Sequence, residues 1–108
     1  MTKGQEKDIM HKAIRIWGEE LQIIMAIEEM SELIKVLTKF LRLKNALDVK
    51  KTEVAGMIAE ERADVSIMLD QLRIIFGNSG MEMHIRDYKM DRLKKRIEDH
   101  ERSESTKN

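Results

Sequence analysis

The chain has 108 residues, of which 42% are hydrophobic and 37% are charged, and it contains no proline and no cysteine. This length fits one domain, and the apolar share indicates a folded protein rather than a disordered one. The 20 basic and 20 acidic residues give a net charge of zero, which argues against a dedicated nucleic-acid binder. Without cysteine, disulfides and thiolate metal sites are excluded.

Composition also predicts the fold class and the compartment. Alanine, leucine, isoleucine, methionine, glutamate, lysine and arginine dominate, which favours an all-α fold. The polar beginning of the chain lacks the apolar core of a signal peptide. No apolar run approaches the ~20 residues that span a bilayer. We therefore expect a cytoplasmic protein without a membrane partner.

The predicted helices, in chain order, span residues 6–16, 19–43, 50–76 and 83–101. The segments expected outside the helices are the frayed ends 1–5 and 102–108, the connection 44–49 and the turn 77–80, within a single domain over 1–108. The first break falls at Trp17-Gly18, because glycine weakens a helix interior. The clearest turn signal is the sequence GNSG at residues 77–80.

The helix predicted over residues 19–43 carries two apolar stripes. One alternates steps of four and three residues: Ile23, Ile27, Met30, Ile34, Leu37 and Leu41. The other lies on a different face: Leu21, Met25, Val36 and Leu43. A helix that is apolar on two faces is buried from two sides. We therefore expect a bundle of two long antiparallel helices plus shorter helices, completed by self-association into at least a dimer.

Acidic residues interrupt the apolar pattern of both long helices. Glu29 and Glu32 lie within the second stripe of the first long helix. Glu61 and Asp64 take mid-stripe positions in the helix predicted over residues 50–76. Its other stripe members are Val54, Met57, Ile58, Val65, Met68, Leu72 and Ile75. Residues three apart share a helix face, so the two acidic pairs would meet near mid-helix in an antiparallel arrangement.

Four carboxylates that converge in an apolar layer require a compensating partner. Buried charge is unfavourable unless it is paired or bound to metal, and like charges raise the pKa values of some members. A hard divalent cation resolves both problems, and all-oxygen ligands suit Mg²⁺ or Mn²⁺. The alternative is a solvated acidic face paired with Lys35, Lys39 or Arg62. Two pairs at core positions of adjacent helices favour the metal site.

A di-iron carboxylate bundle is a competing metal hypothesis. Such a site requires Glu-x-x-His motifs on two helices. None of the three histidines, His11, His84 and His100, has a glutamate three positions earlier. We therefore expect these histidines at the surface.

Two segments resemble the MazG-like nucleotide pyrophosphohydrolases. Residues 26–33, AIEEMSEL, are similar to the EExxEL segment of that superfamily, and residues 60–65, EERADV, are similar to its EExxDV segment. The resemblance covers about residues 15–97. It implies an all-α fold that is usually dimeric or tetrameric. It also implies a nucleotide-pool enzyme that hydrolyses a nucleoside triphosphate between the α and β phosphates, giving a monophosphate and pyrophosphate.

The resemblance assigns roles residue by residue. The implied ligands of Mg²⁺ are Glu29, Glu32, Glu61 and Asp64. Glu28 and Glu60 are candidate catalytic residues that position water or support the ligands, with solvent-facing salt bridges as the alternative. Trp17 is a candidate to stack on the nucleotide base, and the alternative for this single tryptophan is an anchor in the core.

The last predicted helix contains the sequence YKMDRLKKR at residues 88–96. The enzymes that it resembles often have a Lys…Asn…Arg pattern here that touches the nucleotide. Lys89 and Arg96 match this pattern, whereas Leu93 takes the asparagine position. The candidate substrate-binding residues of this helix are Lys89, Arg92 and Arg96, and the alternative is a solvated charged face.

Two other functions compete with a nucleoside triphosphate pyrophosphohydrolase. One is the related phosphoribosyl-ATP pyrophosphohydrolase, which has similar acidic motifs. The other is a catalytically silent helical module whose apolar stripes serve only oligomerisation. The intact set of four acidic residues favours an enzyme over the silent module.

Overall fold

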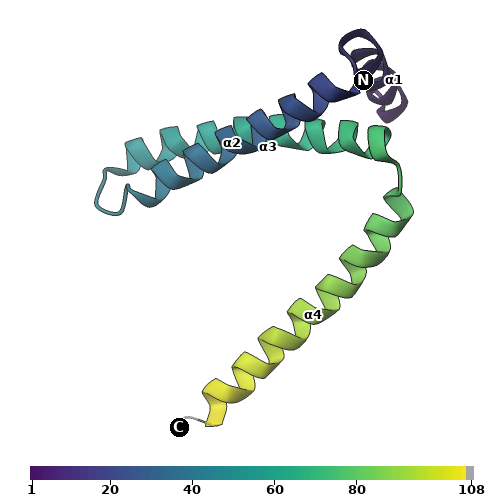
Figure 1. Ribbon diagram of the computed structural model, residues 1–108. Coiled ribbons are helices and arrows are strands. Elements are labelled where there is room, and N and C mark those ends of the chain that lie inside the picture. Colours follow the sequence, from purple (N-terminus) through teal and green to yellow (C-terminus); the bar gives the residue numbers. More distant parts are fainter. Residues whose placement is uncertain (107–108) are drawn as a thin grey trace. The chain divides into compact units, whose positions relative to one another are not determined.

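The computed structural model describes residues 1–106 as four α-helices, with no strand in that range. The helices are α1 (Lys3–Trp17), α2 (Glu19–Leu41), α3 (Asp48–Phe76) and α4 (Ser79–Thr106) (Figure 1). The all-α prediction is confirmed. The chain divides into a compact unit from Met1 to Gly77, which holds α1 to α3, and a second unit that begins at Asn78 and holds α4. The single domain over 1–108 stays a prediction.

Helix α1 begins earlier than predicted because Thr2 forms a capping box with Gln5. The Thr2 side-chain oxygen accepts a hydrogen bond from the Gln5 N–H at 3.1 Å, and Gln5 Oε1 accepts one from the Thr2 N–H at 2.7 Å. These bonds satisfy backbone and side-chain groups at the helix start, so residues 3–5 are helical rather than frayed. The predicted break after Trp17 is confirmed, since Gly18 has φ 88°, which favours glycine.

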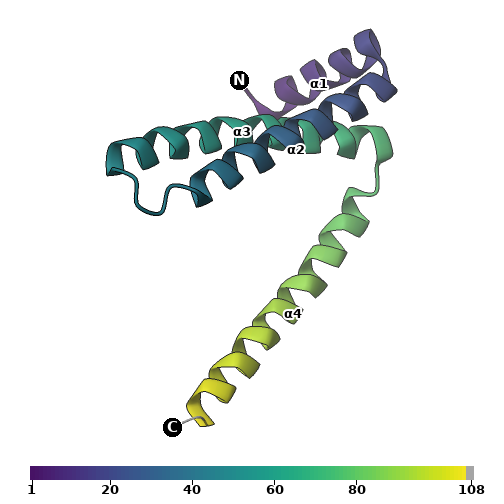
Figure 2. The ribbon, with the colours of Figure 1, turned by 60° about the vertical axis from the view of Figure 1, so that its left-hand side comes forward.

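Helices α2 and α3 form an antiparallel pair, and α1 packs against both (Figures 1 and 2). The connection covers residues 42–47, so α2 ends and α3 begins two residues earlier than predicted. The buried apolar residues lie on these two helices: Ala26, Val36, Val54 and Met68. The two long antiparallel helices expected from the sequence are therefore present and supply the core of the first unit.

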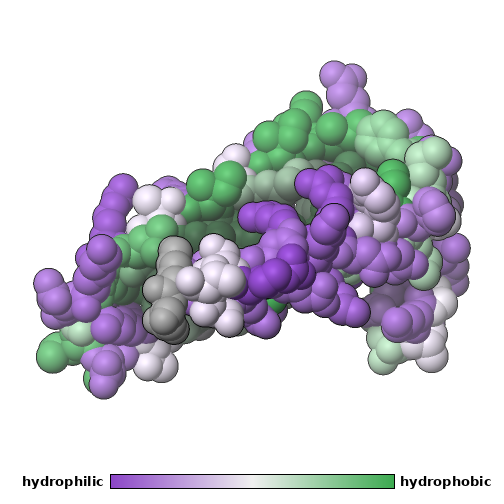
Figure 3. Space-filling view, turned by 90° about the horizontal axis from the view of Figure 1, so that it is seen from below, coloured by the Kyte–Doolittle hydropathy of each residue, from purple (hydrophilic) through white to green (hydrophobic). Residues whose placement is uncertain are grey.

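The face of α2 that meets α3 is the one that carries the acidic interruption. Val36 of the second stripe is buried, whereas three members of the first stripe are open, with Ile27 57%, Ile34 64% and Leu41 70% exposed. Hydrophobic and hydrophilic residues both appear at the surface in Figure 3. Within this unit, no helix therefore covers these three residues, whereas Ile23 and Met30 of the same stripe are half-buried.

Helix α4 extends beyond its predicted ends. Gly77 and Asn78 have φ of 67° and 62°, and the turn is shorter than predicted because α4 begins at Ser79. Residues 102–106, expected to be a frayed tail, continue the helix, and Arg102 pairs with Asp99 at 3.2 Å. The last two residues of the predicted tail lie outside the described residues. No described helix is long and apolar enough to cross a membrane.

Candidate metal centre

Three predicted ligands from two helices come together in the first unit. Antiparallel packing places Glu29 of α2 opposite Glu61 and Asp64 of α3. One carboxylate oxygen from each of the three lies within 4.8 Å of the others. Glu29 and Glu61 are half-buried at this contact. The acidic cluster, defined as Glu29, Glu61 and Asp64, therefore brings together three oxygen donors that could hold a hard divalent cation.

Glu32, the fourth predicted ligand, is exposed and lies outside this group of three. It follows Glu29 by three residues and therefore shares its helix face. Its negative charge acts on the cluster, because it helps to raise the pKa of both Glu29 and Glu61. Glu32 thus contributes to the electrostatic field of the cluster from its edge.

Glu61 carries an oxygen without a hydrogen-bond partner. Its Oε2 atom is buried, and within residues 1–106 it accepts no hydrogen bond. A buried acceptor that loses water without gaining a partner destabilises the folded state. The same oxygen belongs to a side chain that faces two other carboxylates. A bound cation is the partner that would satisfy this atom and neutralise its neighbours.

The electrostatics of the cluster favour protonation or cation binding. Loss of solvation raises the pKa of Glu29 above its ordinary value, and the charges of Asp64, Glu32 and Glu28 raise it further. Loss of solvation also raises the pKa of Glu61, followed by the charges of Asp64, Glu29, Glu32 and Glu60. Repulsion between like charges is therefore stored in the ionised cluster.

The alternative of a salt-bridged surface predicts ion pairs with Lys35, Lys39 or Arg62. Among the residues that the structure describes, none of these cations pairs with a carboxylate of the cluster. The ion pairs observed on α3 lie elsewhere, such as Arg73–Asp70 at 2.8 Å. Protein cations therefore do not neutralise the cluster in the first unit.

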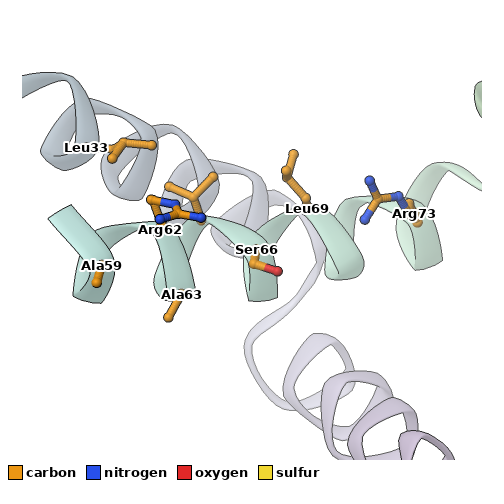
Figure 4. A pocket seen from close by; sticks show the side chains of 8 residues that line it. Leu33, Ala59, Arg62, Ala63, Ser66, Leu69 and Arg73 are labelled. Atoms are coloured by element: carbon orange, nitrogen blue, oxygen red, sulfur yellow. The ribbon is translucent and has the colours of Figure 1, made fainter. Parts of the chain in front are cut away.

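Arg62 follows Glu61 in the sequence but contributes to a separate hollow. The lining residues are Leu33 from α2 and, from α3, Ala59, Arg62, Ala63, Val65, Ser66, Leu69 and Arg73 (Figure 4). This lining is apolar and cationic and contains no carboxylate. One helical position turns the side chain by about 100°, which explains why neighbouring residues serve different surfaces.

The remaining predicted site residues are spread along the chain. Glu28 and Glu60 are exposed beside the cluster, where each raises the pKa of its neighbouring glutamate. Trp17 ends α1 and is 59% exposed, so it is not a core anchor within this unit. The three cations of α4 lie together on that helix, where they line a shallow hollow with Leu93: Lys89, Arg92 and Arg96.

The sequence analysis missed two buried polar residues near the cluster. Gln22 of α2 and Gln71 of α3 are each 6% exposed, and Gln22 Nε2 donates a hydrogen bond to Gln71 Oε1 at 2.7 Å. Because glutamine is polar, the apolar periodicity does not identify these two positions. The signal that could have found them is spacing, because each lies seven residues from an acidic residue of the cluster.

Comparison with protein-family models, with curated proteins and with solved structures gives no match for this chain. The observations that bear on function are therefore those of the chain itself. They are an acidic cluster across two helices, a buried oxygen without a partner and a set of cations on α4.

Proposed function

We propose that this protein is a Mg²⁺-dependent nucleoside triphosphate pyrophosphohydrolase of the MazG-like kind. The observation that carries the proposal is the convergence of Glu29, Glu61 and Asp64 within 4.8 Å across two helices. Two sequence segments support it, because the glutamates and the aspartate fall at the acidic positions of the EExxEL and EExxDV patterns. The substrate class and the reaction rest on that resemblance.

The residues fit a hard divalent cation on three physical grounds. All donors are carboxylate oxygens, which suit Mg²⁺ or Mn²⁺. The buried Glu61 Oε2 has no partner among residues 1–106, and no protein cation pairs with the cluster there. Glu29, Glu61 and Asp64 would hold the ion, with Glu32 at the edge. When bound, Mg²⁺ would neutralise and orient the polyphosphate and make water a better nucleophile.

The proposed reaction is attack of one water molecule on the α-phosphorus. A bond forms from the water oxygen to phosphorus, the bond to the bridging oxygen between the α and β phosphates breaks, and pyrophosphate leaves with that electron pair. The water loses a proton to the solvent, and the other product is the monophosphate. Exposed Glu28 and Glu60 flank the cluster and are candidates to accept a hydrogen bond from this water and orient it.

The chain also offers groups for the rest of the substrate. Lys89, Arg92 and Arg96 share one part of α4, and cations of this kind bind phosphate oxygens through charge-assisted hydrogen bonds. Trp17 presents an exposed ring on which a base can stack. Both roles are part of the proposal. The roles of Lys89 and Arg96 follow the resemblance, whereas that of Trp17 follows from its position before α2 and its being the only tryptophan.

Self-association is part of the proposed function. The open stripe of α2 includes Ile27, Ile34 and Leu41, all more than half exposed. Contiguous exposed apolar surface on a folded unit marks an interaction site, and a second copy offers the same stripe. We expect a dimer or tetramer, and light scattering at micromolar protein concentration is the test. A folded monomer under these conditions would contradict this part of the proposal.

The decisive experiment is product identification with a panel of canonical and modified nucleoside triphosphates in Mg²⁺. We expect a nucleoside monophosphate and pyrophosphate in equal amounts, in an assay that contains no pyrophosphatase. A diphosphate with orthophosphate would contradict cleavage between the α and β phosphates. Phosphoribosyl-ATP belongs in the panel, because its selective hydrolysis would identify the related enzyme class.

Two variants separate catalysis by the cluster from a contaminating activity. Glu61→Gln removes a cluster charge at nearly constant shape and should abolish turnover. The matched control is Glu53→Gln, the same change on the same helix at an exposed position that pairs only with Lys50 at 3.7 Å. The control should keep wild-type activity. No turnover by wild type with any substrate would instead favour the silent oligomerisation module.

A further inference from the structure

A pair of buried amides joins α2 to α3 on the same side as the acidic cluster. Gln22 Nε2 donates to Gln71 Oε1 at 2.7 Å, and Gln71 Nε2 lies 3.8 Å from Met68 Sδ. Both glutamines are 6% exposed. A buried amide group destabilises the folded state unless it is hydrogen-bonded. Their pairing therefore constrains how the two helices meet.

The spacing between the amide pair and the cluster is the same on both helices. Gln22 precedes Glu29 by seven residues, and Asp64 precedes Gln71 by seven residues. Seven residues are two helical turns, or ~10.5 Å at 1.5 Å per residue. In an antiparallel pair, equal spacing means that one register satisfies both contacts. When Gln22 faces Gln71, Glu29 faces Asp64.

The residues between these two contacts do not fix a register by themselves. Ala26 and Met68 are buried there, at 1% and 7% exposure, and apolar contacts have little directionality. A slide by one turn would change which residues face Ala26 and Met68. The same slide would break the Gln22–Gln71 hydrogen bond and leave two buried amides without partners. Buried polar pairs are known to specify helix register in this way.

We propose that the Gln22–Gln71 pair is a positioning device that sets the α2–α3 register and thereby holds Glu29 opposite Asp64 and Glu61. This inference rests on the proposed metal-dependent function. A slide by one turn moves Glu29 about 5.4 Å along α3, which is more than the 4.8 Å spread of the three ligand oxygens. The amide pair thus pre-organises the site for a divalent cation while contributing no ligand.

The test compares metal affinity with stability in a double variant. Gln22→Leu with Gln71→Leu keeps side-chain size and removes both amides, so neither is left unpaired. We expect the melting temperature in EDTA to equal or exceed that of wild type. The Kd for Mn²⁺, measured by the electron paramagnetic resonance of free Mn²⁺, should rise at least about tenfold, as for lost supporting contacts at metal sites. Each single leucine variant should melt below the double variant.

A matched control separates register from general stability. Val54→Ala removes packing from the same helix pair at a fully buried position and leaves the amides intact. It should lower the melting temperature and leave the Mn²⁺ Kd within about twofold of wild type, because the register is unchanged. Gln71→Asn supplies a second variant that keeps the polarity of the core. Its shorter side chain cannot reach Gln22 in the native register, so Mn²⁺ binding should again weaken.

The outcomes distinguish this inference from the function on which it rests. If wild type binds Mn²⁺ and both amide variants bind it equally tightly, the positioning role is wrong and the metal site stands. If Val54→Ala weakens Mn²⁺ binding as much as the double variant does, the amides act only through stability and the inference is also wrong. If wild type binds no Mn²⁺, the metal site and the positioning role fall together.

Discussion

Helices α3 and α4 are of similar length, 29 and 28 residues, yet different interactions stabilise them. Helix α3 packs against α2 and contributes the buried residues Val54, Met68 and Gln71. Helix α4 contributes none. Its local support includes the ion pair one turn apart between Arg102 and Asp99, and surface pairs of this kind are individually weak.

The contrast shows that the electrostatic properties of the acidic cluster depend on the packing of α2 against α3. A carboxylate on an isolated helix stays solvated and keeps its ordinary behaviour. Burial between α2 and α3 desolvates Glu29 and Glu61, and the facing charge of Asp64 raises the pKa of both. We therefore expect variants of the α2–α3 pair to have larger effects than comparable variants of α4.

The largest expected difference is in catalysis. Asp64→Asn removes a charge from the acidic cluster and should lower kcat/KM by at least about 100-fold, because the developing charge loses its electrostatic stabilisation. Lys89→Ala on α4 removes one proposed phosphate contact and should lower kcat/KM by about tenfold, mainly through KM. Steady-state kinetics with the best substrate of the panel measure both. Equal losses would show that α4 is as much part of the site as α3.

The next difference is in stability. Val54→Ala deletes two methyl groups from a fully buried side chain and should lower the free energy of unfolding by about 2 kcal/mol. Leu93→Ala on α4 changes a side chain that is 44% exposed, and its expected effect is within about 0.5 kcal/mol. Urea unfolding gives both values. A loss near 2 kcal/mol at Leu93 would show that another surface covers α4 in the assembled protein.

The same contrast explains what the sequence could predict. Helix formation and the break at Gly18 follow from local signals, and the structure agrees on both. Of the four acidic residues predicted to meet, Glu29, Glu61 and Asp64 come together and Glu32 does not. The face of α2 that meets α3 is determined by tertiary packing and not by local sequence signals. The first stripe contains larger apolar side chains, but most of it is exposed, and the face that meets α3 includes Gln22 and Ala26. Periodicity ranks faces by apolar content and does not detect a hydrogen-bonded amide pair or a small residue that permits close packing.

The terminal boundaries were missed for a different reason. The start of α1 depends on reciprocal hydrogen bonds between Thr2 and Gln5, a capping box that uses glutamine in place of the commoner glutamate. The end of α4 lies in a polar segment without a stop signal. Apolar periodicity carries no information about either end, because neither end packs against a core.

A third prediction concerns metal and stability. Mg²⁺ at about ten times its Kd should stabilise the wild-type fold by roughly 1.4 kcal/mol, because the ion binds the folded site and not the unfolded chain. Asp64→Asn relieves repulsion in the ion-free cluster, so this variant should melt higher than wild type in EDTA and lose most of its response to Mg²⁺. Thermal melts with EDTA and with Mg²⁺ measure both effects.

Controls in both regions sharpen this prediction. Glu53→Gln on α3 and Asp91→Asn on α4 each remove one exposed carboxylate, and both variants should keep the full Mg²⁺ shift. If Asp64→Asn also keeps it, Asp64 is not a ligand and the assignment of the acidic cluster is wrong.

The smallest expected effect is the pH dependence of stability in EDTA. The pKa of Glu61 is raised in the folded protein above the ordinary value of 4.5, so the folded state binds a proton more tightly than the unfolded chain. This contribution to stability is fully present below pH 4.5 and is lost as the pH rises through the folded-state pKa. The side chain at this position in Glu61→Gln cannot ionise, so the stability of this variant does not fall with pH for this reason. Its melting temperature relative to wild type should therefore rise as the pH increases from 4.5.

The comparison of the two proteins reports mainly on the Glu61 side chain, which only wild type can ionise. Glu29 faces the same cluster and keeps the charges of Asp64 and Glu32 as neighbours, so its own contribution falls with pH in both proteins and reduces the contrast only in part. Asp91→Asn on α4 supplies the reference, because it removes one exposed carboxylate outside the cluster. A melting-temperature difference between Glu61→Gln and wild type that stays constant from pH 4.5 upward would contradict the raised pKa of Glu61, and the contrast between the two helices would be lost at the position where burial matters most.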